Sequence, residues 1–76
     1  NEISRVALPA ERRRRASEIL IRHGWVTCQE IQLLFQVSTA TARRDIDHLA
    51  RRGIAVRVYG GAILPELHMA DAGRAR

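Results

Sequence analysis

The sequence predicts a mainly α-helical domain with a small β-hairpin, arranged as a three-helix winged helix-turn-helix. Apolar residues recur at helical spacing in three segments, and the second and third segments are separated only by Gln36-Val37-Ser38. The third segment ends at Gly53, and residues with the alternation of a β-hairpin follow at once. The chain has 76 residues, of which 46% are hydrophobic, so it can build one modest core and one folded domain.

The first predicted helix begins at Pro9, because the N–H that proline lacks would be unpaired at the first helical position anyway. It ends before Gly24, because glycine readily adopts the left-handed conformation that terminates a helix. Its inward stripe consists of Ala16, Ile19, Leu20 and His23. Residues 1–8 show no sustained periodicity, and we expect them to be a flexible lead-in to a winged helix-turn-helix domain over residues 9–65.

The second and third helices are predicted from their caps. Thr27 and Glu30 have the spacing of a capping box, which opens a helix that runs to about Phe35. Ser38 is a strong N-cap for the third helix, and Gly53 ends it. The inward residues are Ile31, Leu34 and Phe35 in the second helix and Ala42, Ile46 and Leu49 in the third.

A β-hairpin, the wing, is predicted after the third helix. Strand-like alternation places Val56 and Val58 on one face. The pair Gly60-Gly61 can adopt the positive φ values of a two-residue turn, and the apolar residues after it return as the second strand. Residues 66–76 have little apolar content, so we expect a linker or disordered tail there.

Composition favours a partner that carries phosphate. All 13 basic residues are arginine, against 8 acidic residues, which gives a formal charge of +5. The one cysteine, Cys28, cannot form an internal disulfide, which favours the reducing cytoplasm. No apolar run approaches the roughly 18 residues that a membrane span needs. The cysteine and histidines lack metal-site spacing, and no phosphate loop or catalytic set is recognisable, so we expect no metal, cofactor or enzyme activity.

The third helix presents a basic face that also carries small residues. The residues turned outward are Ala40, Arg43, Arg44, Asp47 and Arg51. Such a face is typical of a recognition helix in the major groove of DNA. Arg43 or Arg44 could bind guanine O6 and N7, whereas Thr39, Thr41 and the free N–H groups at the helix start suit phosphates. The alternative is a solvated ladder of ion pairs at i,i+4 spacing, such as Arg43 with Asp47.

Two further elements carry candidate phosphate ligands. Arg12 and Arg13 have no acidic residue three or four positions away, and in the first turns of a helix their charge opposes the helix dipole. We therefore expect them to bind DNA phosphates, the alternative being a solvated basic turn. Arg57 and Tyr59 share one face of the hairpin and could reach DNA, although Tyr59 could equally pack on the domain. We expect Asp45 to be structural, accepting hydrogen bonds from a nearby arginine or backbone donor.

Several motifs together point to a known family. They are Val26-Thr27 before Glu30-Ile31, Phe35-x-Val37-Ser38-x-x-Thr41-x-Arg43-Arg44-Asp45-Ile46-x-x-Leu49, Arg52-Gly53-Ile54, and Arg57-Val58-Tyr59-Gly60-Gly61-Ala62. With them, residues 9–65 resemble the N-terminal DNA-binding domain of the DeoR family of bacterial transcriptional repressors. The resemblance implies that Thr41, Arg43 and Arg44 contact DNA, that Ser38 caps the recognition helix and that the wing tip at Gly60 lies near the DNA backbone.

The resemblance also implies a cellular role. It predicts a domain that reads a double-stranded DNA operator for a regulator, in the family a repressor, of sugar or carbon metabolism. A C-terminal domain absent from this chain would bind a phosphorylated sugar and form a homo-oligomer, and residues 66–76 would lead to it. Three positions depart from the family pattern. Ala16 and Ala42 are smaller than the usual aliphatic residues, and we expect the unusual Trp25 to fill the space they leave.

Two other functions remain open at this point. Winged-helix domains also serve as protein–protein interaction modules, but such a module should expose apolar residues on the third helix. Sequence-independent nucleic-acid binding would need only the net positive charge. The basic, small-residue face of the third helix favours sequence-specific DNA binding over both.

Overall fold

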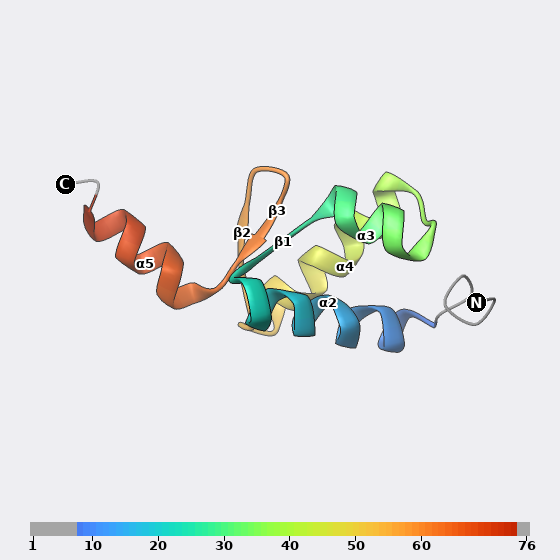
Figure 1. The fold of residues 1–76 in the computed structure, drawn as a ribbon, viewed down its shortest axis with the longest axis horizontal. Helices are drawn as coiled ribbons and strands as arrows, with labels where there is room; N and C mark the ends of the chain where they lie inside the picture. The colour runs from blue at the N-terminus through green and yellow to red at the C-terminus, as the bar shows by residue number, and fades with distance from the viewer. Residues whose placement is uncertain (1–7, 75–76) are drawn as a thin grey trace.

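The computed structural model describes residues 8–74, and it confirms the mainly helical winged helix-turn-helix (Figure 1). Of the expected lead-in, only Leu8 is among the described residues. The elements are α2 (Pro9–His23), β1 (Trp25–Thr27), α3 (Cys28–Phe35), α4 (Thr39–Arg51), β2 (Val56–Val58), β3 (Gly61–Ile63) and α5 (Pro65–Arg74).

The predicted caps delimit the first three helices. Gly24 has a φ of 91° and its N–H donates to the carbonyl of Leu20, which ends α2. Thr27 forms both hydrogen bonds of its capping box at the start of α3. Ser38 Oγ accepts from the N–H of Thr41, 3.1 Å away, at the start of α4. Helix α3 ends at Phe35 as predicted, and its C-cap Gln36 adopts a left-handed conformation without being a glycine.

The wing belongs to a three-stranded antiparallel sheet with the order β1-β3-β2. The segment expected as an extended link between the first two helices is strand β1, which pairs with β3 so that Val26 lies opposite Ala62. On the other side of β3, Arg57 lies opposite Ala62. The sheet therefore attaches the wing to the corner between α2 and α3, and this long-range pairing could not be inferred from the local sequence of β1.

The turn of the wing lies one residue earlier than predicted. Val58 pairs with Gly61, so Tyr59 and Gly60 form the turn, and only Gly60 has a positive φ, 81°. Gly61 is needed for a different reason. A Cβ atom there would collide with the carbonyl oxygen of Val26 and lie 2.8 Å from the Cα of Thr27, so its backbone approaches β1 as only glycine can.

The core lies where α2, α3 and α4 meet the inner face of the sheet. It contains Ala16, Leu20, Val26, Ile31, Phe35, Ala42, Ile46, Leu49, Ala55 and Ala62. Three expectations are wrong. His23 was expected on the inward stripe of the first helix but is exposed, and Leu34 was expected inside but is 53% exposed. Trp25 is 58% exposed, so it does not fill the space beside the small core alanines. Trp25 occupies an outward position of β1, because side chains alternate between the two faces of a strand and Val26 is the buried one.

Helix α5 occupies residues that were expected to form a linker or disordered tail, and it projects from the body of the domain (Figure 1). Pro65 is its first residue rather than only the end of a strand, which suits proline. The N–H groups of Leu67 and His68 donate to the carbonyl of Leu64. Leu67 packs where Gly24 lacks a side chain, since a Cβ on Gly24 would lie 2.6 Å from its Cδ1 atom.

Candidate nucleic-acid interface

Helix α4 buries one stripe and exposes the predicted reading face. Ala42, Asp45, Ile46 and Leu49 are buried, whereas Ala40, Arg43 and Arg44 are exposed. Neither of these two arginines has a side-chain hydrogen bond or ion pair with any other described residue. The predicted ladder pair between Arg43 and Asp47 is therefore not formed. The two guanidinium groups are available to an external ligand.

The first turn of α4 is held by hydroxyl groups. Besides accepting from the Thr41 N–H, Ser38 Oγ lies 3.2 Å from Thr41 Oγ1 as a hydrogen-bond donor. Thr39 Oγ1 accepts from Gln32 Nε2 of α3 at 3.0 Å. These bonds connect the two helices of the helix-turn-helix, so they fix the direction in which α4 presents its free N-terminal N–H groups.

The wing is tied to α4 by an ion pair that the sequence analysis did not predict. Arg57 of β2 donates to Asp47 of α4, which thereby takes the wing arginine rather than Arg43 as its partner. Tyr59 at the wing tip is fully exposed, so the alternative in which it packs on the domain is wrong. At the same tip, the N–H of Cys28 donates to the carbonyl of Gly60 at 2.9 Å, which holds the wing against the start of α3.

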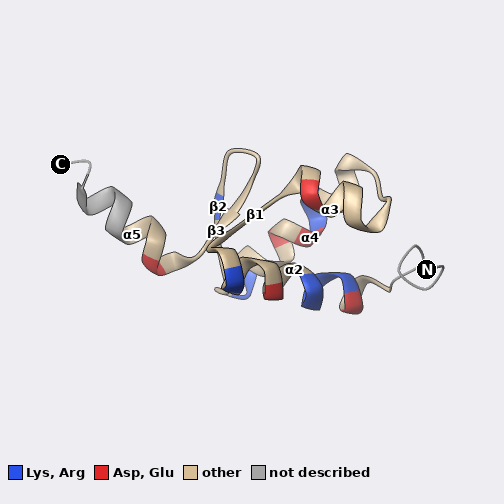
Figure 2. Ribbon diagram, in the orientation of Figure 1, with Lys and Arg blue, Asp and Glu red and all other residues tan. Residues whose placement is uncertain are grey.

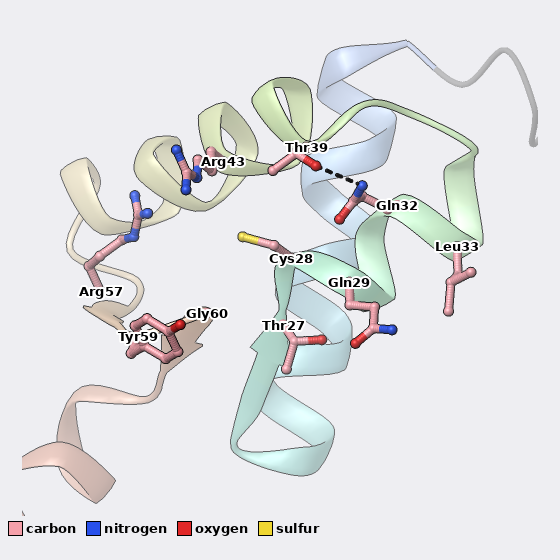
Figure 3. A pocket seen from close by; sticks show the side chains of 10 residues that line it. All are labelled: Thr27, Cys28, Gln29, Gln32, Leu33, Thr39, Arg43, Arg57, Tyr59 and Gly60. Carbon is pink, nitrogen blue, oxygen red and sulfur yellow. Dashed lines mark hydrogen bonds between the residues drawn. The ribbon is translucent and has the colours of Figure 1, made fainter.

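A hollow of about 810 Å³, which we call the wing hollow, is lined by residues of the wing, α3 and α4 (Figure 3). Arg43 of α4 and Arg57 and Tyr59 of the wing lie along one side of it, and α3 forms the other. Gln29 and Gln32 of α3 also line it, and sequence reasoning missed both. Their spacing of three residues on one helix face is the signal that could have found them, once α3 was placed beside the recognition helix.

Arg12 and Arg13 are placed differently from the prediction. Arg12 is buried, and its Nε and Nη2 atoms lie 2.5 and 3.1 Å from the two carboxylate oxygens of Asp45 in α4. Arg13 Nε lies 3.1 Å from the same carboxylate. The prediction that both lack an acidic partner is wrong, because the partner lies 33 residues away in sequence and the argument counted only pairs within one helix. Asp45 has the structural role expected of it.

The family model of the DeoR-like helix-turn-helix domain matches residues 12–67 of this chain. The match covers about three quarters of the chain. The chain belongs to the DeoR-like helix-turn-helix family. No solved structure matches it significantly.

Curated relatives of this DeoR-like domain are transcription regulators by name. The chain is 43% identical over 51 residues to the HTH-type transcriptional repressor GlcR of Bacillus subtilis, which is 67% of this chain and 20% of the relative. It is 42% identical over 60 residues, 79% of this chain and 22% of the relative, to an Escherichia coli O157:H7 protein provisionally named aga operon transcriptional repressor. It is 40% identical over 48 residues, 63% of this chain and 19% of the relative, to the glycerol-3-phosphate regulon repressor of Escherichia coli K12. The chain thus spans about a fifth of the length of these relatives.

Basic residues of the DeoR-like domain occur on α2, α4 and the wing (Figure 2). On α2, the i,i+4 spacing of Arg14 with Glu18 and of Arg15 with Glu11 gives ion pairs at 3.0 and 3.6 Å, on the exposed surface. In α4, burial lowers the pKa of His48 below its ordinary value of 6.5, and the positive charges of nearby arginines lower it further. The field around α4 is therefore positive beyond the reading face as well.

The described residues contain neither a candidate metal cluster nor a candidate membrane-spanning helix. From Leu8 to Arg74, no group of three or more histidine, cysteine, aspartate or glutamate side chains is arranged to hold a metal ion. Within the same residues, none of the helices combines the length and the apolar character needed to traverse a bilayer.

Proposed function

We propose that this DeoR-like domain binds double-stranded DNA sequence-specifically, as the operator-reading part of a transcription regulator of sugar or carbon metabolism. The observation that carries the proposal is the pair Arg43 and Arg44, exposed in the first half of α4 and without a partner among the described residues. Ala40, one turn earlier, leaves room for the helix to approach base edges. Arginine is the residue that most often reads guanine, through two parallel hydrogen bonds to O6 and N7.

The names of the relatives supply the second part of the proposal. Glycerol 3-phosphate is a carbon compound, and the relative named for its regulon is a repressor, as is the relative provisionally named for the aga operon. We extend that role to this chain as an expectation. In the longer protein, a further domain would bind a phosphorylated sugar and join copies into a homo-oligomer. Such a regulator would act in the cytoplasm, where bacterial DNA lies.

The test begins by selecting bound duplexes from a pool with a randomised central segment. Fluorescence anisotropy then compares the selected duplex with a scrambled duplex of equal composition at several salt concentrations. We expect the selected duplex to bind more tightly at every salt concentration. Arg43→Ala or Arg44→Ala should reduce the preference by about 1–3 kcal/mol. Arg22→Ala, which removes an exposed arginine from the last turn of α2, is the matched control and should retain it.

The outcomes separate the alternatives. If selection enriches no sequence and both duplexes bind equally at all salt concentrations, the domain binds nucleic acid by charge alone. If no duplex binds, the protein–protein interaction module becomes the better reading. That module is disfavoured because the large apolar side chains exposed in the described part of the chain, such as Leu33, Leu34 and Met69, lie outside the reading face.

A further inference from the structure

A second hollow, of about 450 Å³, lies on the opposite flank of α4 from the wing, where α4 meets α2. We call it the α2–α4 hollow. Arg13 and Arg14 line it from α2, and His48 and Arg52 line it from α4 and its C-cap. None of the residues that line it is acidic.

The charges around this hollow do not cancel. Arg14 is committed to Glu11 and Glu18, with contacts of 3.2 and 3.0 Å. Asp45 is a single carboxylate with two arginine partners, and Arg12 contacts both of its oxygens. Arg13 shares this carboxylate with Arg12, and the side chain of Arg13 remains 28% exposed.

Arg52 adds a cation that no acidic side chain of the described residues balances. Its side chain is exposed and forms no hydrogen bond or ion pair with the residues that the structure describes. Arg13 and Arg52 therefore approach the same hollow from two elements, with no acidic side chain of the lining between them. Two converging guanidinium groups suit a phosphate oxygen, which each can bind through more than one N–H.

His48 reports the electrostatic potential of the hollow. Burial contributes most to the lowering of its pKa, followed by Arg13, Arg52 and Arg51, and only Asp45 acts in the opposite direction. These groups, from α2 and α4, account for the charges that act on the imidazole. A bound anion would act on the imidazole in the same direction as Asp45 and favour the imidazolium form, which offers two N–H donors instead of one.

The α2–α4 hollow is in reach of the DNA that α4 would read. His48 follows Arg44 by four residues, slightly more than one helical turn or about 6 Å along α4. A helix inserted in the major groove, about 12 Å wide, has a phosphate backbone on each flank. The wing hollow lies on one flank of α4 and the α2–α4 hollow on the other.

We propose that the α2–α4 hollow is a phosphate clamp, in which Arg13, Arg52 and His48 bind a backbone phosphate of the DNA strand on the α2 side of the reading helix. The proposal rests on the proposed DNA-binding function and deepens it. It replaces the expectation that Arg12 and Arg13 bind phosphate together, since Arg12 is buried against Asp45 whereas Arg13 is partly exposed in the lining of the hollow.

The test measures how duplex affinity depends on salt, using a mixed-sequence duplex as the probe so that no operator is needed. Each protein–phosphate contact contributes about 0.9 to the slope of log K against log salt concentration. Arg52→Ala should therefore reduce the magnitude of the slope by about 0.9. Arg22→Ala removes the same charge outside the hollow and should leave the slope unchanged.

The outcome for the clamp is independent of the outcome for the function. If the parent domain binds the duplex, Arg43→Ala weakens binding, and Arg52→Ala leaves the slope at the parent value, the clamp is overturned while DNA binding stands. If the parent domain binds no duplex, the proposed function fails as well, and the clamp with it.

A second readout follows the imidazole of His48 by NMR during titrations at constant ionic strength. We expect the duplex to shift the His48 signals and to raise its pKa, with the exposed His23 of α2 unaffected. Inorganic phosphate is the second probe. If phosphate shifts His48 but the duplex does not, the hollow binds free phosphate rather than the DNA backbone, and the clamp as proposed is wrong.

Discussion

Asp45 is a fully buried carboxylate whose charge is balanced by arginines of another helix. Asp45→Asn would remove one charged partner of a buried ion pair with Arg12, a change that typically costs about 3–5 kcal/mol. We expect the free energy of unfolding in urea to fall by that amount. The control is Glu18→Gln, which breaks only an exposed pair with Arg14 and should cost less than about 1 kcal/mol. Equal losses in the two variants would contradict the structural role of Asp45.

The lowered pKa of His48 predicts a pH dependence of stability. The unfolded chain binds a proton at the ordinary value of 6.5, whereas the folded domain binds it only at lower pH. The unfolded state therefore holds more protons between these two values, and stability falls as pH decreases through them. Thermal melts should show a lower Tm at about pH 5.5 than at about pH 7.5. His48→Gln should weaken this dependence, and an unchanged profile in that variant would refute the assignment.

At the scale of residues, sequence reasoning succeeded where the deciding contacts are local. The pair of Arg14 and Glu18 follows from i,i+4 spacing and is formed. The partner of Arg12 could not be found in this way, because Asp45 reaches it only after α2 and α4 pack together. The same rule assigned Asp47 to Arg43, whereas folding brings Arg57 of the wing to that carboxylate.

Among the elements, the wing depends on two adjacent glycines for different physical reasons. Gly60 needs a positive φ, which asparagine tolerates better than other residues with a side chain. Gly61 needs the absence of a Cβ beside Val26 and Thr27. Gly60→Asn should therefore lower the free energy of unfolding by about 1 kcal/mol or less, and Gly61→Asn by clearly more, because the clash involves backbone atoms. Chemical denaturation measures both, and the reverse order would contradict the assigned turn.

The elements that were predicted correctly are those whose boundaries are marked by capping or turn residues in the sequence. The capping box at Thr27 and the N-cap at Ser38 placed two helix starts to the residue. Strand β1 has only three residues and gains its identity by pairing with β3, more than thirty residues later, so no local pattern marks it. Helix α5 was missed because its short sequence lacks a clear apolar stripe, and Pro65 was read as an end rather than a beginning.

The whole molecule presents one reading helix, whereas operators with two half-sites require two. We expect a single copy to bind weakly. A parallel leucine zipper can be fused after Arg76 through a flexible linker. This fusion should raise the affinity for a duplex with two half-sites one helical turn apart by about 100-fold or more. Anisotropy with a duplex that holds one half-site is the control and should show little gain. Equal affinities of the fused and single forms for both duplexes would contradict this expectation.

At this scale the family and the wing could be predicted from the sequence, because the motif from Phe35 to Leu49 and the Gly60-Gly61 pair occur together in one order. The site was predicted only in part. Arg43 and Arg44 face outward as expected, but the two hollows that flank α4 depend on how α2, α3 and the wing pack around it. No pattern within a single element indicates such packing. Gln29 and Arg52 were therefore not predicted as residues of a binding site.

The contact of Leu64 and Leu67 with Gly24, at the end of α2, sets the orientation of α5 relative to the rest of the domain. The carbonyl of Gly24 accepts from the N–H of Leu64 at 3.0 Å, and the side chain of Leu67 covers the same glycine. Two restraints of different kinds thus act within four residues, and β3 continues into α5 with only Leu64 between them. A torque applied to α5 would be transmitted through this joint to the central strand of the wing sheet, and so to the geometry with which the domain meets its ligand.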